Sequence, residues 1–227
     1  MDRAARGAAA AGNASGANVN RLDAPAFHRN NEPIWQVLAP FLSGRAGDVL
    51  EVGSGTGQHV IEFARRSPDA AWWPNDCIEP HLKSIAAWRA HAGLANVRAP
   101  ARIDLSDLDW ALQADGIEVR KFLAIVCINV LHIAPWRVTE NLLAGAAHLL
   151  RPDGRLFVYG PFMRNGQHTA PSNAAFDASL RRENAEWGVR DADEIGEIAE
   201  RTGLRLAQIV EMPANNLILI FERKPTS

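Results

Sequence analysis

Two kinds of apolar pattern alternate along this chain. Some segments are short and almost continuously apolar, which is typical of buried strands, while others carry apolar residues three and four positions apart, which is typical of helices. The run FLAIVCINVL at 122–131 is apolar on both faces and suits the centre of a parallel sheet. The pattern predicts strands at residues 47–53, 70–76, 96–104, 122–131 and 155–162, and helices at residues 32–42, 58–67, 80–93, 139–150 and 191–203.

The last part of the chain departs from this alternation. Residues 163–190 hold a polar loop and a further helix, an insertion of the size of a lid. Residues 205–212 and 217–223 are strand-like and flank the turn-rich sequence PANN, so they predict a hairpin. Strands that alternate with helices and end in a hairpin predict an α/β fold with a doubly wound sheet, whose ligand lies at the carboxyl ends of the strands.

The length and composition fit one domain. The chain has 227 residues, enough for a single buried core. Residues 1–21 are rich in Ala, Gly and Asn and predict a disordered tail, which leaves 22–227 as the domain. No run approaches the roughly 20 apolar residues that span a bilayer, and the tail lacks the apolar run of a secretory signal. We therefore expect no membrane association and a cytoplasmic location.

Charge and cysteine content narrow the classes of partner. The formal net charge is −2, and no run of Lys and Arg is long enough to follow a phosphate backbone, so we expect no nucleic-acid partner. The two cysteines, Cys77 and Cys127, lie far apart in or beside apolar segments. This placement is typical of free thiols and predicts neither a disulfide framework nor a metal site.

The stretch EVGSGTGQHV at 51–60 joins a predicted strand to a predicted helix, the position at which glycine-rich turns hold nucleotide-like ligands. Its glycines alternate, and Gln58 stands where the G-x-G-x-x-G motif of dinucleotide-binding enzymes needs a third glycine. No lysine follows the last glycine, which excludes the phosphate-binding G-x-x-x-x-G-K motif. Nicotinamide and nucleoside triphosphate cofactors are therefore disfavoured.

The remaining pattern, E-x-G-x-G-x-G, resembles the first motif of class I S-adenosylmethionine-dependent methyltransferases. It is formed by Glu51, Gly53, Gly55 and Gly57. Alternate glycines let the backbone approach the methionine and ribose parts of the cofactor. Asp76 ends the second strand, nineteen residues after Gly57, at the spacing of a ribose-binding carboxylate.

The resemblance implies further contacts to S-adenosylmethionine. An Asp after the third strand often contacts the adenine amine in that family, which indicates Asp104 with Leu105 beside it, and the end of the fourth strand indicates Asn129. His59 is a further candidate, although it suits a surface position on a helix equally. Glu51 also suits a buried network, and Asp104 suits a turn.

Longer stretches are similar to one group, the methyltransferase-like 26 family of bacteria and animals. The similarity covers nearly the whole chain after the tail, and it implies a Rossmann-like class I methyltransferase fold with a seven-stranded, mostly parallel sheet and S-adenosylmethionine as cofactor. It implies no substrate. Asn75 departs from the Ser that commonly precedes Asp76. The matching stretches are RNNEPIWQVL, SGTGQH, SIAAWRA, CINVLHIAPW, YGPF, PSNAAFDASLR, WGVRD and EMPANN.

Segments expected over the strand ends supply candidates for binding the methyl acceptor. His132 is a candidate general base if its pKa is near neutral, and it suits a helix cap equally. Arg29 is able to hold a carboxylate of the substrate or of the cofactor, with Asn30 next to it. Aromatic candidates suit packing as well, and the hairpin asparagines suit a turn. The candidates for the acceptor site are Trp136, Tyr159, Asn173, Phe176, Asn215 and Asn216.

These features together predict a methyltransferase that transfers a methyl group from S-adenosylmethionine to a small molecule by in-line displacement. Such a reaction needs a positioned nucleophile more than a strong acid or base. The absence of a basic surface disfavours RNA, and the lid-sized insertion favours an enclosed site. Two alternatives stay open, a protein methyltransferase and a non-catalytic partner that binds the cofactor. The sequence leaves the acceptor atom and the oligomeric state undetermined.

Overall fold

The computed structural model describes residues 20–110 and 121–225 of the chain. Most of the predicted tail, residues 1–19, lies outside this part. None of the described helices is both long enough and apolar enough to cross a membrane. The helices are α2 (Pro25–Leu42), α3 (Gln58–Arg66), α4 (Glu79–Ala92), α5 (Trp136–Leu149), α6 (Pro171–Glu183) and α7 (Ala192–Thr202), with short 3₁₀ turns η2 (Leu131–Ile133) and η3 (Pro213–Asn215).

The strands form one sheet in the order β3-β2-β1-β4-β5-β9-β8. The pairs from β3 to β5 are parallel, and β9 pairs antiparallel with both β5 and β8. The predicted α/β fold with a mostly parallel sheet and a C-terminal antiparallel hairpin is therefore confirmed. The strands are β1 (Gly47–Val52), β2 (Ala70–Asp76), β3 (Ala101–Arg102), β4 (Phe122–Ile128), β5 (Leu150–Arg164), β8 (Leu204–Met212) and β9 (Asn216–Arg223), and the short strands β6 (Gln167–His168) and β7 (Arg190–Asp191) also pair with β5.

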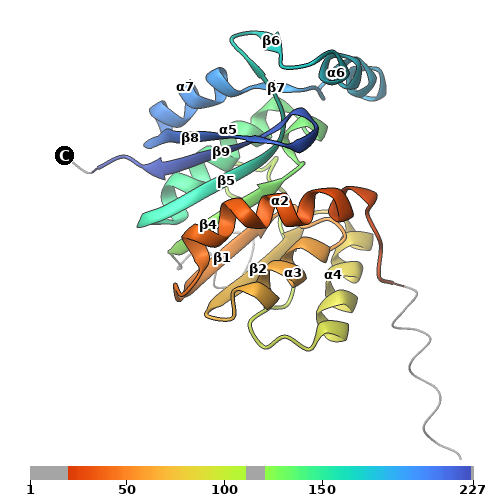
Figure 1. Ribbon diagram of the computed structural model, residues 1–227, viewed down its shortest axis with the longest axis vertical. Helices are drawn as coiled ribbons and strands as arrows, with labels where there is room; N and C mark the ends of the chain where they lie inside the picture. The colour runs from red at the N-terminus through yellow and green to blue at the C-terminus, as the bar shows by residue number, and fades with distance from the viewer. Residues whose placement is uncertain (1–19, 111–120, 226–227) are drawn as a thin grey trace, which may run out of the picture.

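Helices cover both faces of this sheet (Figure 1). One apolar cluster joins α2 and α3 to one face, and another joins α5 and α7 to the opposite face. From Ala124 to Ile128, successive residues of β4 belong alternately to the two clusters, as Ile125 and Val126 do, because side chains alternate across a strand. All residues of β4 are buried, in agreement with its place in the middle of the sheet.

Three elements begin five or more residues away from their predicted starts. Helix α2 begins at Pro25 and passes through Pro33, because Ile34 and the apolar residues that follow it anchor the helix to the core. Strand β5 begins at Leu150, so the predicted turn at 151–154 is part of an irregular strand. Strand β3 is only two residues long and begins after Pro100, which has no N–H to donate to a ladder.

Candidate functional site

A cavity of about 510 Å³ opens at the carboxyl ends of β1, β2 and β4. This is the edge at which doubly wound sheets bind their ligands, and it lies next to the crossover between the neighbouring strands β1 and β4. The cavity therefore gathers side chains from segments far apart in the sequence. The predicted cofactor residues on its wall are Glu51, Gly53, Gly55, His59, Asp76, Asp104, Leu105 and Asn129.

Two glycines of the loop after β1 serve different purposes. Gly55 has a φ of 55° and lines the cavity, and a Cβ built there would meet no atom within 4 Å. Gly57 has a φ of 86°, and a Cβ there would lie 2.9 Å from the Cα of Ile85 on α4. Gly57, predicted to bind the cofactor, is absent from the cavity wall and lets α4 pack against the loop.

Asp76 connects the end of β2 to the glycine loop. Its Oδ2 accepts a hydrogen bond from the Gly55 N–H at 2.9 Å, and its Oδ1 accepts one from the Ile78 N–H at 2.9 Å. His81 Nδ1 lies 3.1 Å from Oδ2. Because a carboxylate oxygen accepts more than one hydrogen bond, the side chain holds the loop and still presents acceptors to the cavity. His81, which also lines the cavity, was missed because nothing in its local pattern marks it.

Asn75 also holds the glycine loop in place through hydrogen bonds. Its Nδ2 donates to the carbonyl oxygen of Glu51 at 2.7 Å, its Oδ1 accepts from the Gly53 N–H at 3.3 Å, and its own N–H donates to Ser54 Oγ at 3.2 Å. The residue is fully buried. The Asn that departs from the related motif is therefore a structural support of the site, which sequence reasoning did not foresee.

Glu51 is the most unusual ionisable group on the wall. Its side chain is 2% exposed, and Oε2 has no hydrogen-bond partner among the described residues. Burial, with a contribution from the nearby charge of Asp76, raises the pKa of Glu51 to about 8. A buried carboxyl without a partner needs either a proton or a cationic neighbour. A positively charged ligand bound next to Glu51 would be such a cationic neighbour.

Asp104 and Asn129 complete the polar part of the wall. The Oδ1 of Asp104 accepts from the N–H of Ser106 at 2.9 Å and from its hydroxyl at 2.7 Å, so the residue both makes a turn and lines the cavity. Asn129 directly follows β4, has a φ of 59° and donates its N–H to the Tyr159 carbonyl at 2.9 Å. Both alternatives considered for Asp104, a turn residue and a wall residue, describe its position.

His59 lies between aromatic rings at the cavity wall. Its ring centroid is 5.0 Å from that of Phe27 and 5.3 Å from that of Phe63. Burial lowers the pKa of His59 to about 4, so the imidazole is neutral at pH 7. Its Nδ1 has no hydrogen-bond partner within the described part of the chain. His59 therefore presents a neutral ring, and not a charge, to a ligand.

Three of the predicted acceptor residues, Asn173, Phe176 and Asn215, lie on α6 or in contact with it. The ring of Phe176 stands edge-on to His132 at 5.5 Å. Asn173 Nδ2 donates to the Asn215 carbonyl at 2.9 Å and to Thr169 Oγ1 at 3.0 Å, so it connects α6 to the hairpin. None of these five side chains lines the cavity.

His132 adjoins the cavity without forming its wall. Its neighbours Ile133 and Ala134 line the cavity, whereas the imidazole is 7% exposed. Burial, followed by the charge of Arg190, lowers the pKa of His132 to about 4. The condition set for a general base, a pKa near neutral, is therefore not met in the unliganded protein, and an imidazole of such low pKa is a weak base.

The other predicted residues also lie off the wall. Arg29 and Asn30 belong to α2, and not to a loop before it. Tyr159 is buried, which raises its pKa to about 12. Trp136 lies under the guanidinium of Arg190, 5.5 Å from its ring centroid. Asn216 Nδ2 donates to the Pro213 carbonyl at 3.2 Å, as expected of a turn residue.

Arg190 was missed by sequence reasoning, because its role appears only in three dimensions. Its guanidinium donates to the carbonyl oxygens of Leu131 and Ala134, some 59 and 56 positions away along the chain. These carbonyls flank the segment that lines the cavity after β4. Arg190 therefore holds one wall of the cavity in place.

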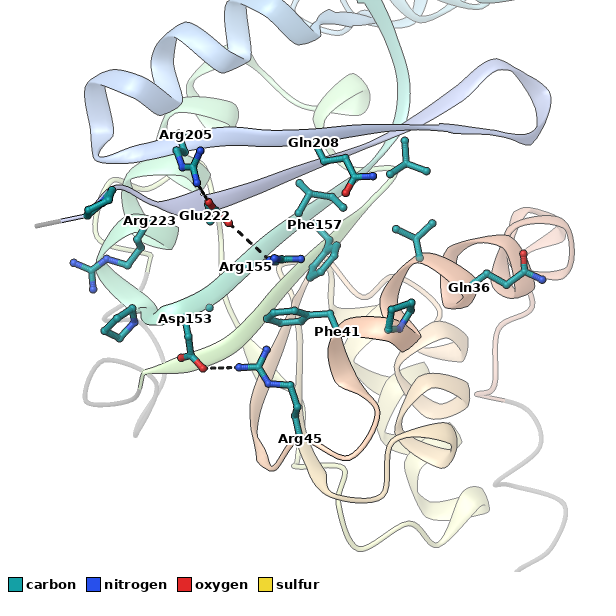
Figure 2. Close-up of a pocket in the computed structure, with 17 residues that line it drawn as sticks. Gln36, Phe41, Arg45, Asp153, Arg155, Phe157, Arg205, Gln208, Glu222 and Arg223 are labelled. Atoms are coloured by element: carbon teal, nitrogen blue, oxygen red, sulfur yellow. Dashed lines mark hydrogen bonds and ion pairs between the residues drawn. The ribbon is translucent and has the colours of Figure 1, made fainter.

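A second hollow, a groove of about 700 Å³, lies between α2 and the strands β5, β9 and β8 (Figure 2). Most of its charged side chains pair with one another: Glu222 bridges Arg155 and Arg205 from neighbouring strands, and Arg45 pairs with Asp153. None of the predicted site residues lines this groove. Although it is larger than the cavity, it holds no arrangement that the predicted chemistry requires. Among the described residues, no group of His, Cys, Asp or Glu is placed to hold a metal ion.

Comparison with known proteins adds a family and a fold. A family described as Protein of unknown function (DUF938) matches residues 21–223. An O-methyltransferase family protein from Burkholderia thailandensis superposes with a TM-score of 0.73 at 18% identity, over 89% of this chain and 58% of that one. Mitomycin 7-O-methyltransferase superposes with a TM-score of 0.68 at 20% identity, over 86% of this chain and 54% of that one.

A methyltransferase of calicheamicin biosynthesis, solved in its S-adenosylhomocysteine-bound form, gives a TM-score of 0.63 at 18% identity, over 85% of this chain and 54% of that one. At such identities the likeness shows the fold, which is Rossmann-like in all of them. The chain spans between 54% and 58% of the length of these three proteins.

Proposed function

We propose that this chain, which belongs to the DUF938 family, is an S-adenosylmethionine-dependent methyltransferase that acts on a small molecule. The observation that carries the proposal is the cavity wall itself. It brings three carboxyl groups, Glu51, Asp76 and Asp104, together with the alternating-glycine loop, from the ends of β1 and β2 and the turn after β3.

Each carboxyl group suits a different part of the cofactor. Asp76 has acceptor capacity for the ribose hydroxyls beyond the two backbone N–H groups that it already holds. Asp104, on the neighbouring turn, suits the adenine amine. Glu51, which is buried and whose Oε2 has no hydrogen-bond partner among the described residues, suits the sulfonium. The bound cofactor would supply a methyl group made electrophilic by its sulfonium.

The rest of the cavity wall favours an apolar acceptor. Phe27, Ile128, Ile133 and Val138 line it. An in-line displacement needs an acceptor held in position and little water, and an apolar wall provides both. The solved structures of similar fold are named as O-methyltransferases, so small hydroxylated molecules are the first acceptors to test. The similarity to the methyltransferase-like 26 family supports the same reaction class and leaves the acceptor open.

Calorimetric titration of the purified chain with S-adenosylmethionine, S-adenosylhomocysteine and NADH tests the proposal. The first two should bind and NADH should not. Asp76→Ala should weaken binding by about 1–3 kcal/mol, the cost of losing charge-assisted hydrogen bonds. Asp69→Ala, an exposed carboxylate at the opposite end of β2, is the matched control and should bind as the wild type does.

Three outcomes contradict the proposal or refine it. If neither S-adenosyl compound binds, the cavity is not a cofactor site. If Asp76→Ala binds normally while remaining folded, the ribose assignment is wrong. If the cofactor binds but no methyl transfer occurs to small hydroxylated molecules or to protein substrates, the chain is a non-catalytic binding partner.

A further inference from the structure

Residues 21–27, which we call the strap, cross from α4 to the start of α2 and form part of the cavity wall. Ala24, Ala26 and Phe27 all line the cavity. Figure 1 shows this stretch descending beside α4 from the amino end of α2. The strap therefore lies beside the glycine loop and forms one part of the cavity wall.

The strap is held by polar contacts at its outer end. The Leu22 N–H donates to Ser84 Oγ at 2.9 Å, and Trp88 Nε1 donates to the Leu22 carbonyl at 2.9 Å. Ser84 Oγ in turn donates to the carbonyl of Thr56 in the glycine loop at 2.7 Å. The guanidinium of Arg21 lies 4.8 Å from the ring centroid of Trp88. These contacts join the strap, α4 and the glycine loop.

Gln58 connects the strap to the glycine loop, and both the oxygen and the nitrogen of its side-chain amide form hydrogen bonds. Its Oε1 accepts from the Ala24 N–H at 2.8 Å and from Thr56 Oγ1 at 3.0 Å, while its Nε2 donates to Asp23 Oδ1 at 2.7 Å. The residue is buried. Hydrogen bonds from His28 and from Gln58 hold the pKa of Asp23 below its usual range, so the acceptor at Asp23 is a carboxylate.

Helix α2 depends on Gln58 because it lacks a cap of its own. Its N-cap residue is Ala24, whose side chain accepts no hydrogen bond, and its first turn carries no acidic residue. The first side chain of α2 that is fully buried in the core is Ile34, more than two turns further along. Polar contacts, together with the ring contact between Phe27 and His59, therefore hold the strap, whereas Ile34 and later residues anchor the rest of α2 to the core.

We propose that Gln58 is a positioning residue that latches the strap over the cofactor cavity and thereby slows release of the cofactor. This inference rests on the proposed function. The inference also explains why Gln58 stands where the G-x-G-x-x-G motif has its third glycine. A glycine has no side chain at this position, whereas the side chain of Gln58 holds the strap in place. Opening breaks the bonds to Asp23 and Ala24 while the apolar part of α2 stays in place.

The test compares Gln58→Glu with the wild type by surface plasmon resonance with S-adenosylhomocysteine as the probe. The variant keeps the shape and the acceptor of the side chain, but it sets a carboxylate 2.7 Å from the carboxylate of Asp23. Loss of this hydrogen bond and the resulting repulsion should raise the dissociation rate constant about tenfold to a hundredfold. Gln208→Glu, on the exposed side of β8, should leave the rate unchanged.

A second substitution separates latching from a merely structural role. In the double variant Gln58→Glu/Asp23→Asn, the amide of the new Asn is able to donate to the new carboxylate, so the pair is restored with its donor and acceptor exchanged. The dissociation rate should return to within about threefold of the wild type. Failure of this rescue, or an unchanged rate in the single variant, would overturn the inference and leave the proposed function intact.

Hydrogen exchange on the wild-type protein provides a test that needs no substitution. Binding of S-adenosylhomocysteine should slow exchange of the amides at 22–24 by at least about tenfold, with a smaller change at 38–42 in the core-anchored half of α2. Equal protection of both segments would refute a separate latch. A wild-type protein that does not bind the probe at all would overturn the proposed function and this inference with it.

Discussion

The ionisation of Glu51 leads to a quantitative prediction about cofactor binding. With a pKa of about 8, its carboxyl group is protonated in all but about one molecule in a hundred at pH 6. A sulfonium ligand interacts favourably with the carboxylate and not with the acid. If S-adenosylmethionine binds the ionised form, its affinity should rise about tenfold per pH unit from pH 6 and level off above pH 8.

S-adenosylhomocysteine provides the matched control, because it carries the same amino and carboxyl groups and lacks the sulfonium charge. The ratio of the two affinities should therefore increase about fiftyfold between pH 6 and pH 8, which is about 2.3 kcal/mol. Isothermal calorimetry at pH 6, 7 and 8, in buffers of different ionisation heat, measures both the ratio and the proton released when S-adenosylmethionine binds.

Substitution of Glu51 by Gln should remove the pH dependence of this ratio. It should also change the pH dependence of folding. Because the pKa of Glu51 is raised in the folded state, its contribution to stability is greatest below about pH 4.5 and is lost as the pH rises towards 8. As the pH rises across this range, the melting temperature of Glu51→Gln should therefore increase relative to that of the wild type. A constant affinity ratio from pH 6 to pH 8 in the wild type would refute the reasoning.

Three further results are expected. Gly57→Ala should destabilise the protein by about 1–3 kcal/mol, because a Cβ there meets the Ile85 backbone, and Gly55→Ala should cost less, since only its backbone conformation is strained; equal melting temperatures would contradict this difference. The thiol of Cys77, which is exposed at the cavity, should react with N-ethylmaleimide more slowly when S-adenosylhomocysteine is bound; an unchanged rate would place the ligand elsewhere. The imidazole of His132 should titrate by NMR near pH 4, with His132→Asn to assign the signal, and a pKa above about 6 would mean that the ring is solvated.

Much of the fold and part of the candidate site were predictable because they depend on local patterns. The apolar run at 122–131 specifies a strand that is buried on both faces, and this places it at the centre of a parallel sheet. Once the order of strands and helices is known, the carboxyl ends of parallel strands share one edge. Glu51, Asp76 and Asn129, each at or just after a predicted strand end, were therefore expected to meet, and the structure brings them to one cavity.

The roles of other residues depend on contacts that no local pattern encodes. Sequence alone gave no reason to connect Gln58 with Ala24, or Arg190 with the carbonyls after β4, because the partners are 34 and more positions apart and come together only when the helices pack. The same holds for His132, whose ring contacts Phe176 on α6 and does not line the cavity.

Periodicity and the ends of strands thus determined the elements, their layers and the edge of the sheet that carries the site. Only the tertiary structure decided which side chains face the cavity, because a side chain's direction is set by packing against distant elements. It also decided that an N-terminal strap forms part of the cavity wall, since this requires α3 and α4 to offer hydrogen-bond partners at the right distance.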